Sequence, residues 1–521
     1  MKPSSRREFL GEVGKGMLVA GLGAGLAEAL SIADVRADTA PDNLSFGTLE
    51  PLVGLMQDTS PDALMPLLVE RLRGGTELRE LVAAGALANA RTFGGEDYIG
   101  FHAFMALAPS LHMAREHSPE RRALPVLKVL YRSSAQIQAK GGRKSEVLHP
   151  IEDVAAIPAN GSLLQKQVRA RDTTAAERSF AGMVSESPKG ALDALQSLVD
   201  EDLDVHRTVL AYRAWSMLEV AGKEHAHTLL RQSVRYCLNV EKSWVGRGYP
   251  EPPIRTILPK VVDAHRLLEI APGSRRAEDG WVEKFSHTLL NSTPEQAADA
   301  TAAALAEGID PTSVGEALTL AANMLVLRDP GRSNRQVQPG KPAGSVHGDS
   351  QGVHASDAVN AWRNMVTVSS RSNALIGLVT AGAFIARSSR GTARDAYPWP
   401  EHLQAVRATD STALLGELDA AVRAGDQVGA CALVQRYGDL GHPAEPVFNL
   451  FLRYATSEDG SLHAEKYYRT VREEFGRTRR TFRWRQLVAL ARVTASEYGR
   501  TAPGYEEACR LLHLDNRTAR S

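Results

Sequence analysis

The sequence predicts an all-α protein in which repeated antiparallel helical hairpins stack into a multi-helix array or bundle. The chain is rich in alanine, leucine, arginine and glutamate, and no segment of useful length alternates apolar with polar residues as a strand would. Its apolar residues instead recur three and four residues apart, as in residues 64–72 and 192–199. That spacing places them on one face of a helix, where a neighbouring helix can bury them.

Four helix starts are indicated by capping residues that precede a proline. The four pairs are Ser60-Pro61, Ser187-Pro188, Thr293-Pro294 and Asp310-Pro311. The first side chain of each pair can accept a hydrogen bond from the first helical turn, and proline suits the first helical position because the N–H it lacks has no partner there. Gln296 adds a capping box to the third pair. We therefore expect a helix to begin at each proline.

The start of the chain, residues 1–37, resembles a bacterial twin-arginine signal peptide. Arg6 and Arg7 precede an apolar run over residues 17–27, and the small residue Ala37 ends a cleavage site. The signal implies that the folded protein uses the twin-arginine translocase as an export partner. It also implies a periplasmic or otherwise exported location, without a stable transmembrane helix after cleavage. The alternative is that the segment is retained as a membrane anchor.

Beyond the signal, the sequence predicts two helical regions separated by a loop. Residues 38–328 form an N-terminal helical region and residues 354–521 a C-terminal one. Residues 329–353 between them are polar and rich in glycine, a composition typical of either a disordered linker or a functional lid. Residues 140–188 also interrupt the helical pattern. The apolar segment 374–386 is too short to span a bilayer and predicts a buried helix.

The composition excludes several classes of function. Acidic and basic residues number 61 each, so no global field favours nucleic acid or an anionic membrane as a partner. Cys237, Cys431 and Cys509 stand far apart, which excludes a cysteine-rich metal site and a disulfide scaffold. They are either three buried thiols or include one long-range disulfide. The arginines from Arg477 to Arg485 interleave with aromatic residues, and we interpret them as a solvated helix face and not a nucleic-acid patch.

A weak internal repeat joins three histidines, each of which follows an apolar residue and opens an expected helix. They are His102, His206 and His354. A second apolar helix is expected near Leu124, Leu229 and Leu375, which stand 22, 23 and 21 residues after the respective histidines. Such equal spacing is typical of duplicated helical hairpins that bury their apolar faces against one another.

Hairpins packed around one axis would bring these imidazoles to a common height. Inward-facing imidazoles can bind a transition metal such as zinc or iron, or hydrogen-bond to a buried ligand. His102, His206 and His354 are therefore candidate metal ligands, and the first two are also candidate cofactor-binding residues. His227 is a further cofactor-binding candidate because Glu224 stands three residues before it, as in di-iron helical bundles. The alternative is that these are core or capping histidines, each bonded to a carbonyl group.

The densest polar cluster of the sequence lies at the end of the 329–353 loop. His347 on the loop and His354 on the next helix are expected to meet across a ligand. Asp357, one helical turn after His354, is expected to orient its ring. His347, His354 and Asp357 are therefore candidate catalytic residues. A solvated, disordered loop is the alternative interpretation.

Two segments that contain these histidines resemble the questin oxidase-like proteins, a group of α-helical oxidoreductases. The segments are Tyr98–Met105 and Gly352–Val359, the second followed by the apolar helix from Ala374. The resemblance spans residues 95–390. It implies an oxidase that performs Baeyer–Villiger-type ring oxidation on an aromatic or polyketide-like compound, with the three repeated histidines lining its pocket.

Together these observations predict an exported all-α oxidoreductase with a histidine-lined site between helices. The site is expected to bind a metal or an aromatic or polyketide-like small-molecule substrate. The alternative is a non-catalytic helical-repeat protein of the periplasm that binds a partner or serves as a scaffold. The sequence contains no H-E-x-x-H pair and no phosphate-binding glycine loop, so nothing in it supports a metalloprotease of that kind or a kinase. Gly348-Asp349-Ser350-Gln351-Gly352 matches G-x-S-x-G, but no strand is expected before it, as the nucleophile elbow of a hydrolase requires.

Replacing Arg6 and Arg7 by lysine tests the export signal. We expect the double variant to accumulate as a folded precursor in the cytoplasm, because the paired arginines are the recognition element and the mature chain is unchanged. Cell fractionation followed by immunoblotting measures the distribution. Normal export of the variant would exclude a twin-arginine signal.

Overall fold

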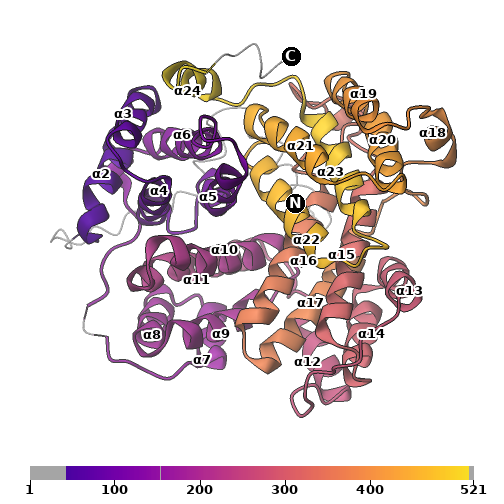
Figure 1. Ribbon diagram of the computed structural model, residues 1–521. Helices are drawn as coiled ribbons and strands as arrows, with labels where there is room; N and C mark the ends of the chain where they lie inside the picture. Colours follow the sequence, from indigo (N-terminus) through magenta and orange to yellow (C-terminus); the bar gives the residue numbers. More distant parts are fainter. Residues whose placement is uncertain (1–42, 153, 515–521) are drawn as a thin grey trace.

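The computed structural model describes residues 43–152 and 154–514, which form an all-helical structure (Figure 1). These residues contain α-helices, short 3-10 helices and three isolated β-bridges, but no strand. Successive helices pack against one another along the chain, so the predicted all-α array is confirmed. The signal predicted for residues 1–37 lies outside the described residues.

The helices of the first half of the chain are drawn in indigo to magenta in Figure 1. They are η2 (Gly47–Leu49), α2 (Glu50–Asp58), α3 (Pro61–Arg73), α4 (Leu78–Phe93), α5 (Tyr98–Glu116), α6 (Leu124–Ala139), η3 (Gly142–Ser145), α7 (Gly161–Arg169), α8 (Thr173–Glu186), α9 (Pro188–Val199), α10 (Val205–Ala221), η4 (Lys223–His225) and α11 (Ala226–Gly246).

The second half continues the same architecture. Its helices are α12 (Ile254–Ala264), α13 (Asp279–Leu290), α14 (Pro294–Ala306), α15 (Pro311–Leu327), η5 (Asn334–Gln336), α16 (Gln351–Val368), α17 (Arg371–Ser388), α18 (Pro400–Ala405), α19 (Ser411–Arg423), α20 (Gln427–Asp439), α21 (Glu445–Ser457), α22 (Ala464–Arg477), α23 (Trp484–Glu497) and α24 (Tyr505–Leu511).

The four predicted helix starts are confirmed, since α3, α9, α14 and α15 each begin at the expected proline. Ser187, Thr293 and Asp310 accept hydrogen bonds from N–H groups of the first turn. Gln296 completes the expected capping box at α14. Ser60 accepts no such hydrogen bond, so the proline is the part of the predicted start signal that α3 retains.

The expectation that residues 140–188 break the helical pattern is wrong for the second half of that segment. From Gly161 onward it forms α7 and α8. Asn160 and Asp172 start these two helices by accepting hydrogen bonds from N–H groups three residues further on, at 2.9 and 3.0 Å. The glycines and prolines that indicated a loop stand before Asn160, where the chain is indeed mostly irregular.

The long polar loop spans residues 328–350, so it ends three residues before the expected end at residue 353. Its last residues, 345–348, are buried beside the C-terminal helices, whereas residues 333–337 and 342–344 are exposed. The Val346 N–H donates to Gln427 Oε1 at 3.0 Å, and the Gly348 N–H donates to Glu497 Oε1 at 3.0 Å. The loop therefore holds a fixed position beside the start of α16.

Two hydrophobic cores stabilise the helices. The first is built mainly from α2 to α17 and α24, and the second mainly from α19 to α23 together with the end of α15. The segment 374–386 lies within α17 in the first core, as predicted for a buried helix. All three cysteines are buried free thiols. Among the described helices, none combines the length and the apolar character needed to cross a bilayer.

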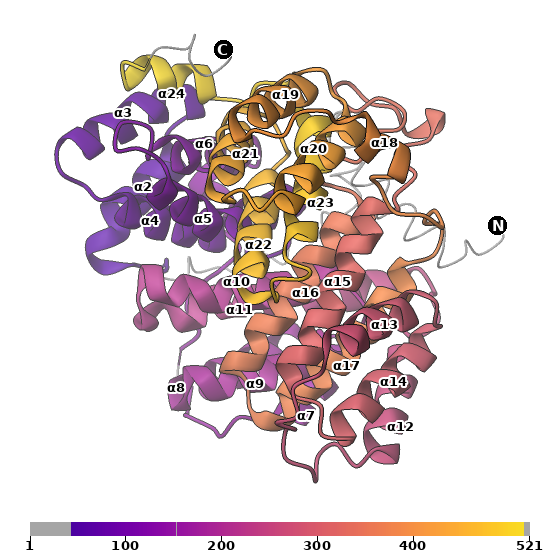
Figure 2. The same ribbon diagram turned by 45° about the vertical axis from the view of Figure 1, so that its right-hand side comes forward.

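Four helical hairpins dominate the centre of the molecule (Figures 1 and 2). They pair α5 with α6, α10 with α11, α16 with α17, and α22 with α23. The first helices of the four hairpins also pack against one another in a closed cycle, in which α5 contacts α10, α10 contacts α16, α16 contacts α22 and α22 contacts α5. This cycle brings together segments from widely separated parts of the sequence.

Gly352 allows the first turn of α16 to lie directly against α15. A Cβ at this position would stand 2.5 Å from the Val326 backbone nitrogen, so Gly352→Ala must push the two helices apart. We expect this variant to lose about 1–3 kcal/mol of unfolding free energy, measured by denaturant-induced unfolding.

The matched control is Gly416→Ala in α19. Gly416 is exposed, and a Cβ added there has no neighbour within 4 Å. We expect this variant to gain roughly 0.5–1 kcal/mol, because alanine reduces the conformational entropy of the unfolded chain. Changes of the same sign in both variants would contradict the close α15–α16 approach.

Candidate metal centre

Four histidine rings meet where the first helices of the four hairpins converge. His102, His206 and His354, the three histidines of the sequence repeat, are joined by His463 at the start of α22. Ring centroids are 5.0 Å apart for His102 and His206, 5.8 Å for His206 and His354, 5.0 Å for His354 and His463, and 5.0 Å for His463 and His102. All four residues are at most 3% exposed. The rings therefore form a closed, buried cycle.

In three of these rings, Nδ1 lies within hydrogen-bond distance of a main-chain carbonyl just before or within the first turn of its own helix. The pairs are His102 with Tyr98 (2.7 Å), His354 with Ser350 (3.0 Å) and His463 with Ser461 (3.0 Å). A carbonyl oxygen only accepts, so Nδ1 must carry the proton and donate it. Each ring is thereby fixed as the tautomer whose Nε2 bears a lone pair, the form that binds metals.

His206 is held in a related way by the residue that caps α10. Asp204 Oδ1 lies 3.3 Å from His206 Nδ1 and accepts the His206 backbone N–H at 3.1 Å. The Tyr236 hydroxyl donates to Asp204 Oδ2 at 2.6 Å. Asp204 therefore stands between a tyrosine and an imidazole, the position of a carboxylate that orients a metal-binding histidine.

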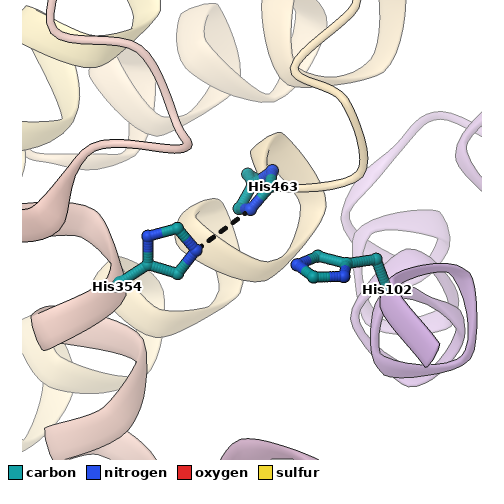
Figure 3. A group of neighbouring side chains, drawn as sticks. All are labelled: His102, His354 and His463. Atoms are coloured by element: carbon teal, nitrogen blue, oxygen red, sulfur yellow. Dashed lines mark hydrogen bonds between the residues drawn. The ribbon is translucent and has the colours of Figure 1, made fainter. Parts of the chain in front are cut away.

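Three of the four rings bring their candidate ligand atoms together. Figure 3 shows the rings of His102, His354 and His463 turned toward a shared space, and their candidate ligand atoms all lie within 4.8 Å of one another. Nε2 of His354 and of His463 are 3.2 Å apart. Nε2 of His102 and of His206 are buried without any hydrogen-bond partner. Both atoms are acceptors that a ligand could use.

The close approach of His354 and His463 is compatible with a cation between them. A hydrogen bond between the two Nε2 atoms requires one of them to carry a proton, which must either leave Nδ1 or charge the ring. Two nitrogens bound to one ion at about 2.1 Å, at tetrahedral or octahedral angles, lie roughly 3.0–3.4 Å apart. The observed 3.2 Å falls in that range. The donor set therefore fits a metal ion.

The surroundings keep these imidazoles neutral. Burial lowers the pKa of His354 to about 3, with the neighbouring His206 and Lys466 acting in the same direction. Burial and then Lys466 hold the pKa of His102 and of His463 well below the usual value. Neutral imidazole is the state that binds metals, because a protonated ring has no free lone pair.

Buried carboxylates near the rings supply negative charge. Burial alone would raise the pKa of Asp204, but the hydrogen bond and charge of His206 outweigh it and hold that pKa below its usual range. Burial also acts to raise the pKa of Asp349. The charges of His347, Lys341 and Arg332 outweigh this effect, so the pKa of Asp349 is lowered as well. Both side chains are therefore anionic and partly offset the charge of a bound cation.

The structure places the candidate catalytic residues beside the rings without the expected contacts. Asp357 does not orient the His354 ring, because His354 Nδ1 donates to the Ser350 carbonyl oxygen. Asp357 Oδ1 accepts a hydrogen bond from the Thr470 hydroxyl at 2.7 Å instead. Burial raises the pKa of Asp357, while Lys466 opposes the shift. Lys466 is itself buried, which lowers its pKa to about 8.

His347 and His227 lie outside the cycle of rings. His347 Nδ1 stands 3.6 Å from both Asp349 Oδ1 and Glu497 Oε1. His227 is in the first turn of α11, and Glu224 is in the separate 3-10 helix η4, so the two do not share one helix as a di-iron motif requires. Burial lowers the pKa of His227 to about 4, aided by Arg231.

His463 is the residue that the sequence reasoning missed. Its signal was present, since the apolar Leu462 precedes it and an alanine follows it, as at His102 and His354. The second helix of its hairpin begins at Trp484, 21 residues later, within the spacing of the other three copies. The repeat is therefore fourfold.

Searches of protein-family models, curated proteins and solved structures found no match to this chain. The interpretation of the site consequently rests on the geometry of its own side chains.

Acid titration tests the buried loop histidine. Burial, with Lys341 as the next cause, lowers the pKa of His347 to about 3, whereas a histidine in an unfolded chain titrates near 6.5. Only the unfolded state then binds a proton as the pH falls below about 6.5, so this group removes up to roughly 1.4 kcal/mol of stability per pH unit. We expect His347→Gln to lack this contribution in urea unfolding at pH 7, 6 and 5. Identical acid dependence in the two proteins would contradict it.

Proposed function

We propose that this protein is an exported metalloenzyme of the oxidoreductase class. His102, His354 and His463 would bind the metal through Nε2, and His206 would be the fourth imidazole in contact with it. The observation that carries the proposal is the group of three buried imidazoles, each with its Nδ1 held by a main-chain carbonyl, whose candidate ligand atoms lie within 4.8 Å of one another. Such an arrangement is costly unless a cation completes it.

The donor set suits a first-row transition metal, and the proposed oxidoreductase activity requires a redox-active one. Imidazole suits iron, copper, zinc and nickel, and the set contains no thiolate. Bound there, iron or copper would supply one-electron and dioxygen chemistry. The chain itself would hold the rings in place, keep His102, His354 and His463 neutral by burial, and offset the added charge with Asp204 and Asp349.

An aromatic or polyketide-like substrate is supported by two observations. The segments that resemble questin oxidase-like proteins contain His102 and His354, two of the proposed ligands. Aromatic rings also adjoin the imidazoles, since the Tyr98 ring lies 4.3 Å from that of His102 and the Phe101 ring 5.2 Å from that of His206. Aromatic walls favour a planar aromatic ligand by stacking and edge contacts.

Export is supported by the Arg6-Arg7 signal together with the metal centre. A pathway that carries folded proteins suits a chain that acquires its metal before it leaves the cytoplasm. Metal loading and export are therefore parts of one proposal, and the export variant described above tests the second part independently.

A non-catalytic metal-binding helical protein is the second candidate, because the four rings are at most 3% exposed. A closed site of that kind is typical of structural metals, whereas a catalytic site keeps an open coordination position. Azide distinguishes the two. We expect azide to change the absorption spectrum of the iron- or copper-loaded protein if the site is open, and to leave it unchanged if the metal is structural.

Metal analysis of purified full-length variants tests the centre. We expect about one metal ion per chain in the wild-type protein and at least a roughly tenfold loss of occupancy in His102→Ala, His354→Ala and His463→Ala, because each removes one ligand. Elemental mass spectrometry measures the occupancy, and circular dichroism verifies that the variants are folded.

His227→Ala is the matched control, since it removes a partly buried histidine at the start of a helix outside the cycle. It should retain the wild-type metal content. A wild-type protein that stays metal-free after loading with iron, copper and zinc, or ligand variants that bind as the wild type does, would overturn the proposal.

A further inference from the structure

A groove of about 800 Å³ lies at the far end of α5 from the histidine cycle. It is bounded by the end of α3, the turn into α4, the end of α5 and the turn before α6, with Leu512 after α24 closing one side. Figure 1 shows α3, α6 and α24 together at this edge of the molecule. Arg115 lines the groove 13 residues beyond His102 on the same helix, which corresponds to roughly 20 Å. The groove is therefore separate from the proposed metal centre.

The floor of the groove is apolar. It is formed by Val69, Leu72, Leu78, Leu111, Ala114, Ala123 and Leu512. Volume and lining match those of sites for drug-sized organic molecules, which are mostly apolar with a few polar groups that fix the orientation of the ligand.

Four arginines surround this floor without carboxylate partners among the described residues. Arg73 donates to the Leu511 carbonyl at 2.5 Å, and Arg79 donates to the carbonyls of Glu219 and Val220 at 2.5 and 3.1 Å. These acceptors are uncharged, so both guanidinium groups keep their full positive charge.

Arg115 and Arg122 complete the rim. Both are exposed, and no carboxylate within the described part of the chain forms an ion pair with either. Elsewhere in the protein, arginines such as Arg169 and Arg479 are paired with glutamates. Two free guanidinium groups beside an apolar floor are thus available to a ligand.

Two glutamates also line the groove, but each is engaged locally. Glu77 forms the capping box of α4 with Glu80. Hydrogen bonds from Ser118 and from its own backbone lower the pKa of Glu120. The groove is lined by four guanidinium groups and two carboxylates, so its rim carries a net positive charge.

We propose that this groove binds an amphipathic organic anion. The apolar body of the ligand lies on the floor, and its carboxylate pairs with Arg115 and Arg122, since a guanidinium fork matches a carboxylate in two parallel hydrogen bonds. A cationic amphiphile would meet the same floor but be repelled by the rim. The ligand class is therefore set by the combination of the two surfaces.

Calorimetric titration of the full-length protein with dodecanoate tests the proposal. We expect saturable binding at one site, at least roughly tenfold tighter than the binding of dodecyltrimethylammonium, which has the same chain and the opposite charge. Acetate, which has the head group alone, should not bind measurably. Equal binding of the anionic and cationic chains would overturn the proposal.

Charge reversal at the rim locates the site. The double variant Arg115→Glu/Arg122→Glu should weaken dodecanoate binding at least tenfold. The matched control Arg394→Glu/Arg407→Glu makes the same charge change at two exposed arginines outside the groove and should alter binding less than about twofold. If dodecanoate binding weakened equally in the two double variants, the loss would come from the change in net charge alone. That result would contradict binding in this groove.

Two further variants keep the result decisive. Thr76→Trp fills the groove from an irregular turn, so it should abolish binding while circular dichroism and metal content stay unchanged. Unchanged binding in that variant would place dodecanoate elsewhere. A chain ended after Leu514 should bind dodecanoate as the full chain does. Tenfold tighter binding after this truncation would mean that the C-terminal residues occupy the groove, which would also overturn the proposal.

Discussion

The hydrogen bond from an imidazole Nδ1–H to a carbonyl at the start of its own helix is the constraint on which the centre of this molecule depends. It fixes the tautomer and the rotation of His102, His354 and His463 in one step. Because every acceptor is backbone, the helix that supplies the ring also aims it. The packing of α5, α10, α16 and α22 in a cycle then brings the candidate ligand atoms of these three rings within 4.8 Å of one another. Local geometry and tertiary packing are therefore both necessary, and neither defines the site alone.

The all-α class, four helix starts and the convergence of three histidines followed from periodicity, capping residues and equal spacing. The fourth ring was missed because the repeat was read only as far as α17, although Leu462-His463-Ala464 carries the same pattern. Asp357 was assigned to His354 from helical spacing, but the first-turn carbonyl competes for the same nitrogen and is nearer along the chain. Side chains that reach across helices, such as Thr470 to Asp357, leave no signal in sequence spacing.

The long loop shows a second limit on what the sequence can predict. Its glycines and polar residues are typical of a solvated segment, yet Val346 and His347 are buried. The loop is polar because it supplies charges to the interior, where Lys341 and Arg332 meet Asp349. A segment that forms a buried ion cluster and a segment that forms a solvated loop have the same amino-acid composition. They differ in the side chains of other elements that pack against them. His206, His354 and His463 lie at or within the first turns of their helices, where the helix dipole adds positive potential. Asp204 and Asp349 are therefore important to any cation bound there.

The order in which the rings occur along the chain links the centre to folding. His102 and His463 stand near opposite ends of the described sequence, so the cycle closes only after the last hairpin has been synthesised. Contacts between residues so far apart in the sequence form late in folding. Closing the long loop between them costs chain entropy before the contacts can stabilise the folded protein. A nascent chain that lacks α22 holds at most three of the four rings. Ion binding would therefore stabilise only the finished chain, and the centre would act as a thermodynamic check on completeness.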